Sequence, residues 1–103
     1  MNQTTRDPTD LLQHDLDDAA QAERLESLRK QDTEDLKWLM AHKQGRRIVW
    51  SLLSSAGVTR TPWNHSGSVT AFNCGKQQIG LELLARIMEH VPEAYVVMLK
   101  EHK

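Results

Sequence analysis

Apolar residues recur at helical intervals through the last third of the chain, and this period constrains the fold more than any other feature. The recurring residues are Phe72, Ile79, Leu83 and Ile87, with Leu84, Met88 and Val91 beside them. Spacings of four and seven residues put apolar side chains on one face of a helix, whereas a strand needs sustained two-residue alternation, which no segment shows. The sequence therefore predicts an all-α domain of three or four helices.

Two further helical segments are predicted before this one. Asp32 is expected to cap a helix in which Leu36, Leu39 and Met40 are apolar. The next segment is expected to end at Gly57. Its apolar residues, predicted to share one buried face, are Ile48, Val49, Leu52, Leu53 and Ala56. Gly45 either breaks this region into two helices or lies inside one long helix, and the sequence leaves both open.

A final short helix is expected after Pro92, since proline fits the first helical position, where its missing N–H is not needed. Tyr95, Met98 and Leu99 would form its apolar face. Residues 58–69 contain proline, asparagine, serine and glycine and are predicted to be a loop.

Charge divides the chain into two parts. Residues 1–35 carry ten acidic and four basic residues, whereas residues 36–103 carry nine basic and four acidic ones. The first ten residues are polar and are expected to be disordered, and residues 11–30 have too thin an apolar stripe for more than a marginal helix. The predicted organisation is a flexible acidic N-terminal arm (residues 1–31) followed by a helical core domain (residues 32–103).

The stretch TAFNCGKQQIG, residues 70–80, contains a Gly-Lys pair typical of phosphate-binding loops. A Walker loop needs glycine and Ser or Thr where this chain has Thr70 and Gln77, so nucleotide binding is not expected. Gly75 and Gly80 are instead interpreted as positions where a neighbour such as Trp50 or Trp63 presses on the helix. Thr70 or Asn73 would cap this helix, with Phe72 pointing inward.

No residue pattern typical of an enzyme is present. Cys74 is the only cysteine, which excludes an internal disulfide and a cysteine-based zinc site, and it is expected to be a partly buried structural thiol. The five histidines show no metal-binding spacing. We expect no catalytic residue, metal, cofactor or small-molecule substrate, and the sequence predicts neither a membrane span nor a secretory signal.

Basic and aromatic residues suggest a contact surface for a partner protein or nucleic acid. The candidates are Lys43, Arg46, Arg47, Arg60, Trp63 and Lys76. Arginine near aromatic rings binds phosphate backbones and unstacked bases, but a solvated basic face around a core Trp50 explains the same residues. Trp38 lies off the predicted apolar face, and exposure there would indicate a protein interface.

Three segments, GRRIVWSLLSSAGV, TAFNCGKQQIGLELLARIM and PEAYVVMLKE, resemble in order a family of small tailed-phage proteins encoded among the virion genes of podophages and prophages. The resemblance covers about residues 35–102 and rests on the motifs GRRxxW, TAFNxGxxxxGxxLL and YxxMxKE. It implies a protein of the virion and host cytoplasm that is carried in the capsid or at the portal and tail junction and is ejected with DNA. The matching residues, interpreted as mainly structural, are Gly45, Arg46, Arg47, Trp50, Phe72, Asn73, Gly75, Gly80, Tyr95 and Met98.

The leading hypothesis is a non-enzymatic virion component that binds portal, tail or ejection proteins, or itself, through its helical core. The alternative is a nucleic-acid-associated protein whose acidic arm competes for the basic face, in which case deleting residues 1–31 should raise DNA affinity. Inhibition of a host factor is a third hypothesis.

Overall fold

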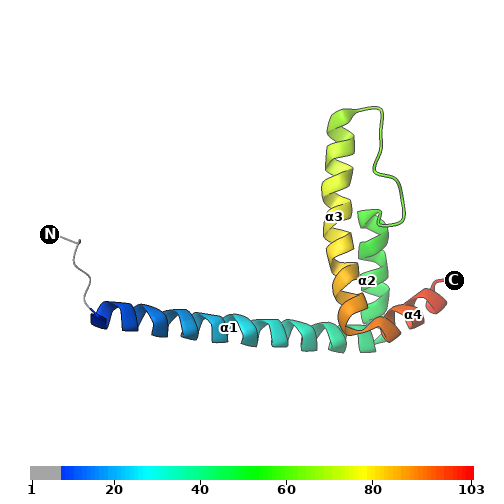
Figure 1. The fold of residues 1–103 in the computed structure, drawn as a ribbon. Helices are drawn as coiled ribbons and strands as arrows, with labels where there is room; N and C mark the ends of the chain where they lie inside the picture. Colours follow the sequence, from blue (N-terminus) through cyan, green and yellow to red (C-terminus); the bar gives the residue numbers. More distant parts are fainter. Residues whose placement is uncertain (1–7) are drawn as a thin grey trace. The chain divides into compact units, whose positions relative to one another are not determined.

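The computed structural model describes the backbone of residues 8–103 and the side chains of residues 11–103. Four helices account for most of these residues: α1 (Pro8–Ala41), α2 (Lys43–Ala56), α3 (Gly67–His90) and α4 (Pro92–Glu101) (Figure 1). The described part of the chain contains no strand, so the all-α prediction is confirmed. The chain divides into two compact units, an arm of residues 1–34 and a core of residues 35–103.

Helix α1 corrects two expectations about the N-terminal region. Residues 8–10, predicted to be disordered, form its start, while residues 1–7 lie outside the described part. Asp32 lies inside α1 instead of capping a new helix. No glycine or proline occurs between residues 9 and 44, and a residue that favours caps does not by itself stop a run of good helix formers.

The break between α1 and α2 is at His42, which has an extended backbone with φ −105° and ψ 137°. Gly45 follows in the first turn of α2, where it is buried. A Cβ added at Gly45 would overlap the backbone carbonyl of Leu39. The open question about Gly45 is therefore answered: it breaks no helix, and its missing side chain lets the end of α1 approach α2 closely.

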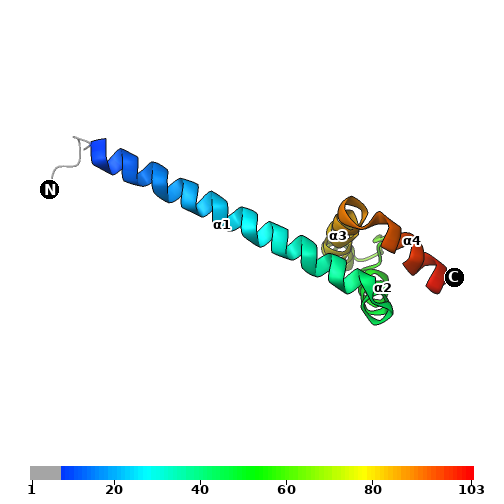
Figure 2. The same ribbon diagram turned by 90° about the horizontal axis from the view of Figure 1, so that it is seen from below.

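The core is a single apolar cluster that joins the last turns of α1 to the other three helices. α2 and α3 lie side by side in both views, and α4 packs against both (Figures 1 and 2). The buried residues are Leu36, Met40, Val49, Leu53, Ile87, Val91 and Met98. Trp50, Leu83, Leu84 and Tyr95 pack against this cluster while half-exposed. Fully burying such side chains stabilises a fold by about 1.5–3 kcal/mol each, so this small cluster is the main source of core stability.

The start of α3 differs from the prediction. Ser66 is the N-cap, and its Oγ accepts a hydrogen bond from the Val69 amide at 3.4 Å, so neither Thr70 nor Asn73 caps the helix. Both instead fasten the preceding loop. The hydroxyl of Thr70 accepts from the Asn64 amide at 2.9 Å, and Asn73 Nδ2 donates to the Pro62 carbonyl at 3.2 Å.

A third side chain of α3 completes this attachment of the loop. Gln77 Nε2 donates to the carbonyl oxygens of Gly57 at 2.8 Å and Arg60 at 2.7 Å. Gly57 itself ends α2 in the left-handed conformation, with φ 73°, as predicted. The predicted loop is thus confirmed, although α3 begins at Gly67, inside the range assigned to it.

Helix α4 begins at Pro92, which confirms the predicted role of this proline. Met98 is fully buried and Tyr95 is half-buried, also as predicted. Leu99 is 40% exposed and does not belong to the buried cluster, so that part of the predicted apolar face is wrong. The face that α4 buries is set by its contacts with α2 and α3, which the local sequence does not encode.

Candidate protein-interaction surface

An apolar strip on α2 faces away from the core. Val49 and Leu53 are buried, but their neighbours Ile48 and Leu52 are 57% and 56% exposed. The prediction of one buried face for all of these residues is therefore wrong. Residues three and four apart share a helix face, so α2 carries two adjacent apolar strips, and the core covers only the one that starts at Gly45.

A second exposed strip runs along α3. Phe72, predicted to point inward, is 68% exposed, and Ile79, which belongs to the same predicted apolar face, is 71% exposed. With Lys76 and Leu83 they follow the spacing i, i+4, i+7 and i+11, which places all four on one side of the helix. The ammonium of Lys76 lies 5.5 Å from the centre of the Phe72 ring, a cation–π distance. This strip combines apolar area with a positive charge.

The two strips border a groove between α2 and α3, called here the α2–α3 groove. It has a volume of about 280 Å³ and is lined by Leu52, Ser55, Ala56, Lys76, Ile79, Gly80 and Leu83. Gly80 sets how near the helices come, because a Cβ there would lie 2.6 Å from Ala56 Cβ and 2.7 Å from Val58 Cγ1. The predicted close packing at Gly80 is thus correct, although its neighbours are small aliphatic residues and not a tryptophan.

Gly75 behaves differently from Gly80. Nothing lies within 4 Å of the position that its Cβ would occupy, so the prediction of a packed neighbour is wrong for this residue within the described chain. Glycine inside an exposed helix costs about 1 kcal/mol relative to alanine. No contact within the described chain offsets that cost.

The predicted basic residues do not form one patch. Lys43 and Arg47 are exposed on α2, and Lys76 lines the α2–α3 groove. Arg60 Nη2 donates to the Ser54 carbonyl at 2.6 Å, which ties the loop to the end of α2. Arg46 donates hydrogen bonds to Glu101 and to the Met40 carbonyl, both within the core. Of the candidate cations, Lys43, Arg47 and Lys76 are the ones placed to meet a partner.

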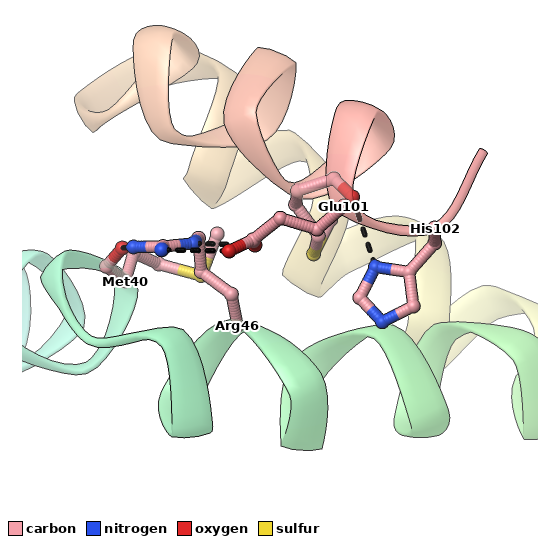
Figure 3. A network of polar contacts seen from close by, with 5 residues as sticks. Met40, Arg46, Glu101 and His102 are labelled. Carbon is pink, nitrogen blue, oxygen red and sulfur yellow. Dashed lines mark hydrogen bonds and ion pairs between the residues drawn. The ribbon is translucent and has the colours of Figure 1, made fainter.

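Arg46 forms an ion pair with Glu101 that joins α2 to α4 (Figure 3). Its Nε and Nη2 donate to the two carboxylate oxygens of Glu101 at 2.7 and 2.9 Å, and its Nη1 donates to the Met40 carbonyl at 2.9 Å. The side chains of Arg46 and Glu101 are only 14% and 19% exposed. The hydrogen bonds from Arg46, followed by its charge, lower the pKa of Glu101 below its ordinary value.

The three tryptophans have different surroundings. Trp50 is half-buried and stacks on the His102 ring at a centroid distance of 4.6 Å. His102, labelled in Figure 3, has its Nδ1 2.9 Å from the Met98 carbonyl oxygen. Trp38, which lies off the predicted apolar face, is 66% exposed, and Trp63 is 62% exposed beside His65. Exposed tryptophans are frequent anchors of protein interfaces.

The residues considered for chemistry in the sequence are the lone cysteine and the possible metal ligands. Cys74 is exposed, which corrects the expectation of a partly buried thiol. Among the side chains of residues 11–103, no three from His, Cys, Asp or Glu are grouped so that they could hold a metal ion. No helix within this described range is long and apolar enough to cross a membrane.

A protein-family model described as Bbp19-like phage protein matches residues 36–100. The chain belongs to this family. The Bbp19-like region contains all of α2 and α3, and therefore the complete α2–α3 groove, while the arm lies outside it. No curated protein and no solved structure matches the chain. The predicted phage origin is thereby confirmed at the level of a phage protein family.

Sequence reasoning missed Ile48, Leu52 and Ile79 as surface residues, although two signals pointed to them. Helix α2 has more apolar residues than one buried helix face accommodates. The exposed strip on α3 has Lys76 in its middle. A lysine among apolar residues is typical of a partly solvated surface, where its stem covers apolar area and its charge stays in water.

Proposed function

We propose that this phage protein is a non-enzymatic structural or accessory component of the virion that acts by binding another protein through the α2–α3 groove. The main support for this proposal is that α2 and α3 each expose a strip of apolar side chains beside the groove. Contiguous apolar surface of this kind is uncommon on monomeric soluble proteins and marks sites of association.

The groove has the composition of an interface centre. Ile79 and Leu52 are more than half exposed, and burying one such side chain completely contributes about 1.5–3 kcal/mol. Phe72 lies one turn before Lys76 on the same side of α3, and Lys76 supplies a charge in the groove lining. Arg47 lines a neighbouring depression on α2 that shares Leu52 with the groove. Aromatic and aliphatic residues at the centre with polar residues around them are typical of protein interfaces.

Incorporation into particles tests this proposal. The chain should be found in purified virions by mass spectrometry, and Ile79→Glu should reduce its incorporation strongly because a carboxylate cannot be buried in an apolar contact. Gln78→Glu is the matched control, since it adds the same charge at the neighbouring exposed position of α3, outside the groove lining. Absence of the wild-type chain from particles would refute a virion role, and equal incorporation of both variants would exclude the groove.

A second candidate function, association with nucleic acid, is favoured by the aromatic and basic residues at one end of α3. Phe72 is 68% exposed next to Lys76, and Trp63 is 62% exposed on the loop. Bases of single strands stack on such rings while cations contact phosphates. Single-stranded DNA binding should then fall steeply with salt, and replacing Asp15, Asp17 and Asp18 by asparagine should strengthen it. No binding by either protein at low salt would eliminate this candidate.

A further inference from the structure

The arm has features that complement the α2–α3 groove. Residues 8–23 carry five acidic residues and no lysine or arginine. On the other side of the contact, Lys76 lines the groove and Arg47 lines the adjacent depression on α2 that shares Leu52 with it, and among the described residues neither forms an ion pair with an acidic side chain. An acidic helix is therefore the kind of ligand that the charges around this groove favour.

The same part of the arm also offers apolar side chains. Leu12, Leu16 and Ala19 are spaced i, i+4 and i+7 along α1, so they lie on one side of the helix. Leu12 and Leu16 are 59% and 57% exposed. A helix that presents such a strip can lay it into an apolar groove, which is a frequent mode of peptide recognition.

The occupant that fits these features is a second copy of the chain. Helix α1 is continuous from Pro8 to Ala41, and the sequence has no glycine or proline between residues 9 and 44. One copy can therefore present its acidic segment as an unbroken helix, which is the form that the groove of another copy would receive.

We infer that the acidic arm of one copy binds in the α2–α3 groove of another copy, with Leu12 and Leu16 against Leu52 and Ile79 and the arm carboxylates near Arg47 and Lys76. The contact is heterologous, so it either closes into a dimer that exchanges arms or continues as a ring or filament. The inference rests on the proposed function in taking the groove as a protein-docking site, and it identifies the partner.

The open space around Gly75 is consistent with this arrangement. Gly75 lies one residue before Lys76 and has no neighbour within 4 Å of its would-be Cβ. A position without a side chain beside the groove lets the backbone of an incoming helix come close to α3. An external contact would account for a glycine that the described chain itself leaves uncovered.

Two complementary variants test the inference with the full chain. Ile79→Glu damages the groove and leaves the arm intact, while Leu12→Lys combined with Leu16→Lys damages the arm and leaves the groove intact. All three positions are exposed and both new residues are good helix formers, so folding should be retained, as circular dichroism will show. By sedimentation velocity, wild type should associate, and each variant should raise the dissociation constant at least about tenfold.

Mixing the two variants gives the decisive result. One intact arm and one intact groove remain in the mixture, so a complex of the two variants should form even though each alone stays monomeric. Its affinity should fall as salt rises. Gln13→Lys combined with Gln21→Lys, which adds the same two charges to the arm outside the leucine strip, should retain self-association.

Other outcomes would overturn the inference in distinguishable ways. Self-association of the groove variant alone would indicate arm-to-arm pairing, and self-association of the arm variant alone would indicate pairing of grooves. A monomeric wild type that still enters particles through Ile79 would refute self-assembly but leave the proposed function standing. Self-assembly of a chain that is absent from particles would leave the inference standing and refute the virion role.

Discussion

Arg46 at the start of α2 binds both carboxylate oxygens of Glu101 at the end of α4, across 55 residues of sequence. The same guanidinium donates to the Met40 carbonyl at the end of α1. One side chain therefore links three helices through three hydrogen bonds. The planar fork of arginine fits this geometry, whereas the ammonium of lysine provides no such fork.

Arg46→Lys should loosen the end of α4, because lysine cannot satisfy both oxygens of Glu101 and the Met40 carbonyl together. Amide hydrogen exchange in residues 92–101 should become severalfold faster, and the melting temperature should fall. Arg47→Lys is the control, since Arg47 is the adjacent exposed arginine and no hydrogen bond or ion pair fixes it in the described part of the chain. Unchanged exchange in Arg46→Lys would show that the pair is not needed for docking α4.

Core stability should depend on pH through Glu101. Its pKa is lower in the folded protein than in the unfolded chain because Arg46 donates hydrogen bonds to it. A lowered folded pKa gives stability that is complete above the unfolded value, about 4.3 for glutamate, and that is lost as pH falls through the folded pKa. Thermal unfolding between pH 7 and pH 3 should show this loss, and Glu101→Gln should lack that component. Glu82→Gln, on the exposed surface of α3, should retain the wild-type profile.

Alanine substitution at two glycines of α3 should have opposite effects. Gly80→Ala places a Cβ against Ala56 and Val58, and overpacking of about 1–3 kcal/mol should exceed the gain in helix propensity of about 1 kcal/mol. Gly75→Ala meets open space and should stabilise the core by roughly 0.5–1 kcal/mol. Denaturant unfolding measures both. A stabilising Gly80→Ala would mean that α2 and α3 are not in close contact there.

Two methionines provide a matched test of the core. Met98 is fully buried, so Met98→Ala should leave a cavity and cost about 2–5 kcal/mol. Met88 is 47% exposed, and Met88→Ala should cost less than about 1 kcal/mol. Urea denaturation of both variants gives the comparison. Similar losses for the two would contradict the position of Met98 at the centre of the cluster.

The local sequence predicted two helix ends correctly, whereas the cap expected at Asp32 was wrong. Gly57 and Pro92 mark the end of α2 and the start of α4 because each residue has a backbone conformation that its position requires. The break at His42 and the cap at Ser66 were not predicted. Several residues near each helix start are equally able to cap it, so which residue becomes the cap depends on how the chain packs.

The sequence by itself determined that this chain is helical, that an acidic part precedes a basic one, and that its motifs resemble those of a phage family. Only the tertiary structure decided which apolar residues are buried. Ile48 and Val49 are equally apolar neighbours, yet one is exposed and the other lies in the core. Helical period groups residues into strips but does not say which strip a neighbouring helix covers, because that depends on contacts between distant segments. The α2–α3 groove and the use of Arg46 within the fold instead of on its surface follow from those contacts.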